Sequence, residues 1–375
     1  MISCLVITIT LVSCGNFFDL FGNDSNDYQE DNNDQNHDGN DNNKPEKEDT
    51  TLTPGSPLQG NTLQEKLFAI SQRTDNNKYY EIVINENVTC NPLQVRTGGK
   101  NVVVKIFSEQ QNRYTLTLGS PGGMFSVYDN VTLILENIVI QGQPGNISAL
   151  LRVESGGKLV INDGTVITGN ENRNERSSPW GRERDAEYSS EGGGVYVGQN
   201  AGMIMNGGSI CYNKRIHNSL GHGGGVVIDK DGYFNMLGGS IYQNEANDGG
   251  GGGVAVFFGE FLMNGGEIAG NKAYYGGGVY VRSYNLFYSS LTSTFIKEPL
   301  QGEISSGIIW GYPANDGKEN YANGPTVWYA WKEGYYCVYR ESTLGEYHSI
   351  STLYVWLNYN SNTIHPLSEW EYRAN

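Results

Sequence analysis

Short runs of alternating apolar and variable residues recur along the middle of the chain and give the first indication of its fold. Four of these runs begin with three consecutive glycines, at residues 192–197, 223–228, 251–256 and 276–281. Their starting points are separated by 31, 28 and 25 residues. A period of this length indicates one supersecondary unit stacked on itself, not a domain built around a single compact core.

When the units are aligned, rows that stay apolar alternate with rows that vary. The apolar rows of the first strand are Val195, Val226, Val254 and Val279, then Val197, Ile228, Val256 and Val281; the row between them is Tyr196, Val227, Ala255 and Tyr280. The second and third strands add Met203, Phe234 and Phe261, then Met205, Met236 and Met263, then Ile210, Ile241 and Ile268, while Asn235 falls in a variable row. Because successive side chains of a strand point to opposite faces, the apolar rows are predicted to face inward and the variable rows outward.

Glycine and asparagine recur at the turns between these strands. Glycine pairs at 207–208, 238–239 and 265–266 allow the positive φ of tight bends. An asparagine follows the third strand in four units, as Asn170, Asn213, Asn244 and Asn271. We expect these amides to stack and to hydrogen-bond from coil to coil, so the role predicted for them is structural.

Weaker copies of the unit extend the repeat in both directions. With residues 306–311 and 327–329 included, the pattern predicts an all-β parallel β-helix of about ten coils over residues 79–358. Before the coils, residues 62–73 predict a helix, because Thr62 and Glu65 fit a capping box and Leu63, Leu67 and Ile70 form an apolar face. A short amphipathic helix in this position is expected to cap the first coil and its unpaired strand edge.

The repeated phrase over residues 192–213, with its copies at 223–244 and 251–271, resembles two known groups of proteins. It is similar to right-handed parallel β-helices of pectin-lyase-like architecture, and more closely to bacterial surface repeats of the polymorphic outer-membrane-protein type. The resemblance is specific over residues 151–281 and weaker over 79–358. It implies right-handed coils, because the period alone does not fix the hand.

The first residues resemble an export signal. Residues 4–12 are mostly apolar and too few to span a bilayer, and Leu11-Val12-Ser13-Cys14 resembles the lipobox of bacterial lipoproteins. This resemblance implies a signal peptide over residues 1–13 and an acylated Cys14 that anchors the chain in a membrane. No Lys or Arg precedes the apolar run, and a plain signal peptide with a chance cysteine is the alternative.

An acidic stretch rich in Asn and Asp separates Cys14 from the repeats. Residues 15–50 hold eleven acids and two lysines, in a chain whose net charge is −16. Such a composition cannot bury enough surface to fold, so residues 14–60 are expected to be a disordered tether to a β-helix domain over residues 61–375. The acidity argues against nucleic-acid binding, and the widely spaced cysteines predict neither a metal site nor a cofactor.

One tripeptide raises the question of catalysis. Gly221-His222-Gly223 resembles an element of galacturonases of this fold, which also use paired acids to cleave polyuronates. The coils contain neither the Asp-Asp pair nor the Arg-x-Lys element that the resemblance requires, so we expect the protein not to be an enzyme. A pectin-lyase-like lyase or hydrolase is the alternative.

Two departures from the repeat are candidate binding surfaces. An insertion over residues 171–191 gathers cationic and aromatic side chains suited to carboxylate, sulfate, sugar or peptide ligands: Arg173, Arg176, Trp180, Arg182, Arg184 and Tyr188. The aromatic-rich end over residues 300–375 adds Trp328 and Trp331. The alternatives are an insertion without a ligand and a C-terminal stretch that only caps the last coils.

Taken together, these features predict a bacterial envelope lipoprotein at the outer membrane or cell surface. It is expected to act as a non-catalytic, adhesin-like scaffold. Its predicted partners are the membrane, through Cys14, and a glycan or protein ligand; a carbohydrate-binding module is a further alternative.

Overall fold

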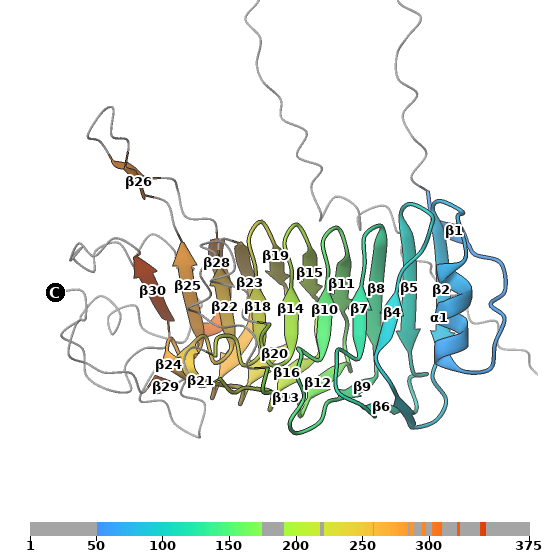
Figure 1. The fold of residues 1–375 in the computed structure, drawn as a ribbon, viewed down its shortest axis with the longest axis horizontal. Coiled ribbons are helices and arrows are strands. Elements are labelled where there is room, and N and C mark those ends of the chain that lie inside the picture. The colour runs from blue at the N-terminus through green and yellow to red at the C-terminus, as the bar shows by residue number, and fades with distance from the viewer. Residues whose placement is uncertain are drawn as a thin grey trace, which may run out of the picture. The chain divides into compact units, whose positions relative to one another are not determined.

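The computed structural model describes residues 51–174, 191–217, 221–257 and 259–283, and then five strand segments at 286–288, 295–297, 302–309, 321–322 and 338–342. These residues form an all-β parallel solenoid of about seven turns, with helix α1 (Leu63–Ser71) at its N-terminal end (Figure 1). The predicted fold class is therefore confirmed.

The largest sheet, here called the long sheet, contains two strands of each coil. Its first arm is, in spatial order, β1 (Thr53–Pro54), β2 (Lys78–Val83), β5 (Val102–Phe107), β8 (Val131–Glu136), β11 (Lys158–Ile161), β15 (Gly202–Met205), β19 (Tyr233–Met236) and β23 (Glu260–Ala269), with β28 (Gly302–Ile309) paired to β23. Its second arm continues from β23 through β20 (Ser240–Tyr242), β16 (Ser209–Cys211), β12 (Val166–Thr168), β9 (Val139–Gln141), β6 (Thr115–Leu118) and β3 (Val88–Cys90). The two arms form one sheet because β23 pairs with both β19 and β20.

Two further parallel sheets complete the coils. The glycine-run sheet contains β30 (Val338–Ser342), β25 (Val279–Ser283), β22 (Val254–Phe257), β18 (Val226–Ile228), β14 (Val195–Val197), β10 (Leu151–Val153), β7 (Phe125–Val127) and β4 (Leu93–Val95). The short sheet contains β13 (Glu171–Asn172), β17 (Lys214–Arg215), β21 (Glu245–Gly250), β24 (Lys272–Tyr275) and β29 (Tyr321–Ala322). A separate antiparallel pair joins β26 (Leu286–Tyr288) and β27 (Phe295–Lys297).

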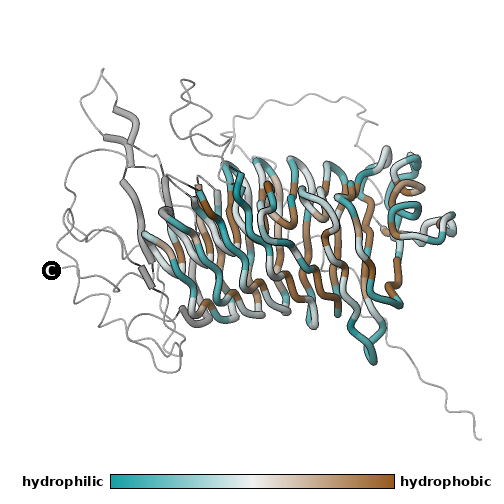
Figure 2. Tube along the Cα trace, turned by 60° about the horizontal axis from the view of Figure 1, so that its bottom comes forward, coloured by the Kyte–Doolittle hydropathy of each residue, from teal (hydrophilic) through white to brown (hydrophobic). Residues whose placement is uncertain are grey.

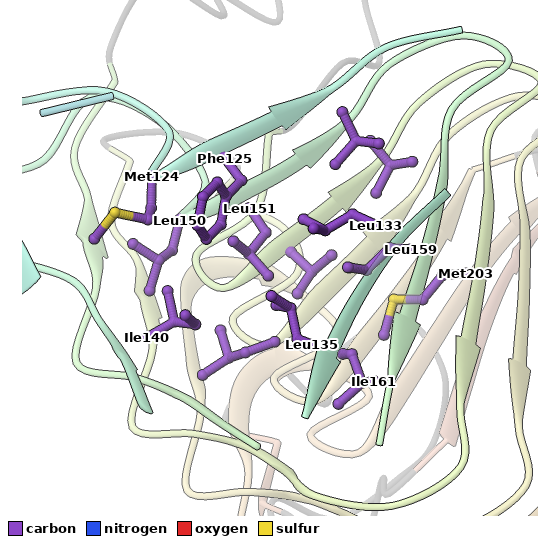
Figure 3. Close-up of a cluster of buried hydrophobic side chains, with 14 of the residues drawn as sticks. Met124, Phe125, Leu133, Leu135, Ile140, Leu150, Leu151, Leu159, Ile161 and Met203 are labelled. Atoms are coloured by element: carbon purple, nitrogen blue, oxygen red, sulfur yellow. The ribbon is translucent and has the colours of Figure 1, made fainter. Parts of the chain in front are cut away.

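The strand register confirms the predicted apolar rows. Val195 pairs with Val226, Val226 with Val254, and Val254 with Val279. In the long sheet Met203, Phe234 and Phe261 are in register, as are Ile210, Ile241 and Ile268. These side chains belong to one continuous buried core that runs along the coils, part of which Figure 3 shows around Phe125, Leu133 and Leu159.

The row predicted to face outward from the glycine-run sheet is also buried. Tyr196, Val227, Ala255 and Tyr280 form a second cluster with Ala149 and Phe257, separate from the interior core. Tyr196 is 8% exposed and Tyr280 is 1% exposed. The alternation of apolar and polar positions is visible along each coil in Figure 2, but on this sheet the outer row adds hydrophobic packing of its own.

The four asparagines predicted to stack do form a buried ladder. The backbone N–H of Asn170 donates to Oδ1 of Asn213 at 3.2 Å, that of Asn213 to Asn244 at 3.0 Å, and that of Asn244 to Asn271 at 2.9 Å. Each of these side chains is at most 1% exposed. Asn146 extends the ladder by one coil, because its Nδ2 donates to Oδ1 of Asn170 at 2.9 Å.

Helix α1 caps the first coil as expected, two residues shorter at its C-terminal end than the predicted 62–73. Thr62 is its N-cap, and the predicted capping box with Glu65 is formed. Leu63, Leu67 and Ile70 are buried in the interior core, and the helix contacts β4, the edge strand of the glycine-run sheet. Among the described residues no helix is long and apolar enough to cross a bilayer.

The expected number of about ten coils is wrong, since the solenoid makes about seven turns. The prediction divided the chain by the spacing of the glycine runs, but two turns are longer. The strand paired with Val195 begins at Leu151, 44 residues earlier, and the strand paired with Val279 begins at Val338, 59 residues later. Residues 302–309 do repeat the unit, as β28 beside β23, while residues 327–329 lie outside the described residues.

Replacing Asn244 by alanine should destabilise the solenoid by about 2–4 kcal/mol, because the buried Asn213 N–H and the Ile210 carbonyl both lose a partner. Urea unfolding followed by circular dichroism measures this loss. The control is Asn206→Ala, since the exposed Asn206 donates only at the surface, to Asn162, and should cost less than about 1 kcal/mol. Equal losses in the two variants would contradict the structural role of the ladder.

Candidate functional site

The two ends of the predicted insertion meet at one point of the solenoid. Nδ2 of Asn172 donates to the Gly192 carbonyl at 2.6 Å, which links the last residue of β13 to the first glycine of the next coil. The Arg173 N–H donates to the Asn146 carbonyl at 2.7 Å. Glu171 and Asn172 belong to the short sheet, paired with Lys214 and Arg215, so the insertion begins at Arg173, two residues later than predicted.

A buried arginine holds the start of the insertion in place. Arg215 is 0% exposed, and its guanidinium donates to the carbonyls of Asn172 at 3.1 Å and Asn174 at 2.9 Å. Burial lowers the pKa of Arg215 to about 10, while the carboxylate of Glu191 opposes that change, so the side chain is still charged at neutral pH. The insertion thus leaves the coil from a fixed, hydrogen-bonded base, here called the insertion base.

Charged side chains on the glycine-run sheet surround the other end of the insertion. Arg152 on β10 forms ion pairs with Glu154 at 2.7 Å and with Glu191 at 2.8 Å, and its guanidinium lies 4.9 Å from the centre of the Tyr196 ring. Burial alone would lower the pKa of Arg152, but the two carboxylates raise it above its usual value. Because Glu191 directly precedes the glycine run, these contacts fix the point where the insertion returns.

Tyr196 extends this network to the next coil. Its hydroxyl donates to Oδ2 of Asp229 at 2.6 Å, across the paired strands β14 and β18. Burial, together with the carboxylate of Asp229, raises the pKa of Tyr196 well above its usual range. The phenol therefore stays protonated and acts as a donor.

His222, the residue that raised the question of catalysis, is packed as a structural side chain. It is 6% exposed, and its Nδ1 accepts a hydrogen bond from the Gly250 N–H at 2.9 Å. Its ring lies 4.9 Å from that of Phe257 and 5.1 Å from that of Tyr280. This placement joins successive coils and favours the structural interpretation of the Gly-His-Gly element.

Of the predicted ligand-binding residues, the structure places Arg173 alone, whose side chain is 57% exposed and paired with Glu171. The other predicted residues lie outside the described residues: Cys14, Arg176, Trp180, Arg182, Arg184, Tyr188, Trp328 and Trp331. Their roles stay predictions.

Sequence reasoning missed Arg215, although the repeat contained a signal for it. In register, Arg215 pairs with Ala246 and Ala246 with Ala273. A buried position that is alanine in two coils and arginine in the coil next to the insertion marks a local specialisation.

A groove of about 800 Å³ lies on another corner of the coils, where strands of the first arm end; we call it the corner groove. Its lining includes Phe107, Glu109, Glu136, Asn137, Asp163 and Asn206. Among the residues that the structure describes, no group of three or more His, Cys, Asp or Glu side chains is arranged to hold a metal ion. The sequence pattern did not reveal this groove, because the loop after β5 that forms one wall does not repeat.

Comparisons with protein-family models, curated proteins and solved structures find no match. Any assignment of function therefore depends on the chain's own residues and geometry.

Replacing Arg215 by methionine should destabilise the protein by about 2–3 kcal/mol, because the buried carbonyls of Asn172 and Asn174 lose a charged donor. It should also speed tryptic cleavage after the arginines of the insertion. Urea unfolding and timed proteolysis measure the two effects. Arg173→Met, which removes an exposed arginine two residues into the same segment, should change stability by less than about 0.5 kcal/mol. If the two variants behaved alike, the insertion base would not depend on Arg215.

Proposed function

We propose that the protein is a lipid-anchored bacterial envelope protein that acts as a non-catalytic, adhesin-like scaffold. In this proposal Cys14 carries the anchor, residues 15–60 act as a tether, and the solenoid presents its insertion to an anionic glycan or to a protein at the cell surface. The coils then supply rigidity, while the insertion supplies the contact.

The observation that carries this proposal is the insertion base. The solenoid devotes a buried arginine, the Asn172–Gly192 hydrogen bond and the ion pairs of Arg152 to the two ends of one insertion. Loops held on a rigid scaffold are where binding residues concentrate. The arginines and Trp180 of the insertion are suited to bind carboxylate or sulfate groups and sugar faces.

The packing of His222 supports the non-catalytic part of the proposal. A general acid or base must reach the bond that it acts on. The imidazole of His222 instead accepts a backbone hydrogen bond and packs against two aromatic rings.

Removing the insertion's ligand-binding groups should weaken binding without changing the fold. We expect the full chain to bind a sulfated or uronate glycan, and the triple variant Trp180→Ala, Arg182→Gln, Arg184→Gln to bind it about tenfold more weakly. Glycan arrays followed by calorimetry with heparan sulfate and polygalacturonate measure this. Lys230→Gln, which removes a cation from an exposed turn elsewhere, is the control.

Two outcomes of that experiment would contradict the proposal. One is equal binding by the triple variant and the wild type. The other is the appearance of new reducing ends or unsaturated products from polygalacturonate that disappear in His222→Ala, which would make the protein an enzyme.

The anchor has a separate test. In a bacterial host, the full chain should incorporate labelled palmitate, globomycin should block its processing, and Cys14→Ser should abolish the label. Cys4→Ser, which removes a cysteine inside the apolar run, should retain it. An unlabelled wild-type protein would remove the anchor from the proposal and leave the test of the insertion unaffected.

A further inference from the structure

The corner groove is built from the same corner of successive coils. Glu136 and Asn137 follow β8, Asn162 and Asp163 follow β11, and Asn206 follows β15. The strands they follow are neighbours in the long sheet, so polar side chains recur along the groove at intervals of about 4.8 Å. Such a row matches a ligand that is itself extended.

One wall of the groove is held in a fixed shape. Nδ2 of Asn137 donates to the carbonyls of Ser108 at 3.2 Å, Glu109 at 3.0 Å and Asn112 at 2.9 Å. The guanidinium of Arg113 reaches across to the Gly164 carbonyl at 3.3 Å. The loop over residues 108–113 is therefore tied to the two following coils, and the groove is formed before any ligand arrives.

Hydrogen bonds within the wall engage its amide donors and leave acceptors available. Nδ2 of Asn206 donates to Asn162 at 2.9 Å, and Nδ2 of Asn162 donates to Oε2 of Glu136 at 3.0 Å. Among the described residues, the carboxylates of Glu109 and Asp163 make neither a hydrogen bond nor an ion pair. The groove thus offers acceptors and negative charge, which suits a ligand that donates hydrogen bonds and carries positive charge.

The protein's own Lys105 shows how a cation sits beside this groove. Its ammonium lies 2.7 Å from Oε1 of Glu136 and 4.7 Å from the centre of the Phe107 ring. Both Glu136 and Phe107 line the groove. A carboxylate combined with an aromatic face is a favourable environment for an ammonium or guanidinium group, and the groove adds two further carboxylates without such a partner.

We propose that the corner groove binds an extended, positively charged peptide segment, with lysine or arginine side chains directed at Glu109 and Asp163. The acceptor-rich lining disfavours the anionic glycans expected at the insertion, so the two surfaces take partners of opposite charge. The proposal rests on the groove alone and stands whether or not the chain is lipid-anchored.

The test uses the full chain and an acetylated, amidated octapeptide of alternating lysine and serine. Calorimetry should detect binding that weakens as salt rises from roughly 20 to 300 mM. The isosteric double variant Glu109→Gln, Asp163→Asn should bind about fivefold more weakly, and Gln110→Glu should bind more tightly. Asp231→Asn, which removes the same charge from a different corner with a positive φ that asparagine tolerates, is the control and should match the wild type.

Carbodiimide cross-linking, followed by mass spectrometry, locates the bound peptide. Cross-links from its lysines to Glu109 or Asp163 are expected. The proposal is overturned if the cross-links fall only on the acids of residues 15–50, if the double variant binds like the wild type, or if the lysine peptide does not bind. Binding of the neutral probe cellohexaose that is insensitive to salt and lost in the double variant would also overturn it, and would assign the groove to a glycan.

Discussion

The whole structure depends on in-register stacking of identical turns, and the buried asparagine ladder is the interaction that enforces it. A parallel coil must bend where its third strand ends, and the bend exposes backbone groups that the neighbouring coil cannot all satisfy. Asn213 and Asn244 satisfy them from within, by linking the backbone of one coil to the side chain of the next. Because an unpaired buried amide is costly, a slip of one residue would be penalised in every coil at once.

This constraint explains why the fold could be predicted from the sequence and why the number of coils could not. Rows such as Val195, Val226 and Val254 repeat because every coil places the same atoms in the same surroundings, and the rows can be found by alignment. The residues between Val279 and its partner Val338 are not bound by that repetition. A period measured on the regular coils therefore overestimated how many turns the remaining chain makes.

The candidate sites follow the same division. The arginines of the insertion could be recognised as a departure from the repeat, and Arg215 could have been recognised because alanines occupy its row. The corner groove depends on how Asn137 ties down the loop over residues 108–113, and that contact is made between coils. Local sequence patterns carry no information about such contacts, so the groove could only be found in three dimensions.

The bond between Asn172 and Gly192 has a consequence for how this protein can change over time. Because both ends of the insertion are joined at one place, the neighbouring coils are indifferent to how many residues lie between them. Lengthening such a loop costs little, about 0.6 kcal/mol for each doubling. The insertion base therefore works as an interchangeable socket, in which new loops can be tried while the solenoid beneath keeps its register.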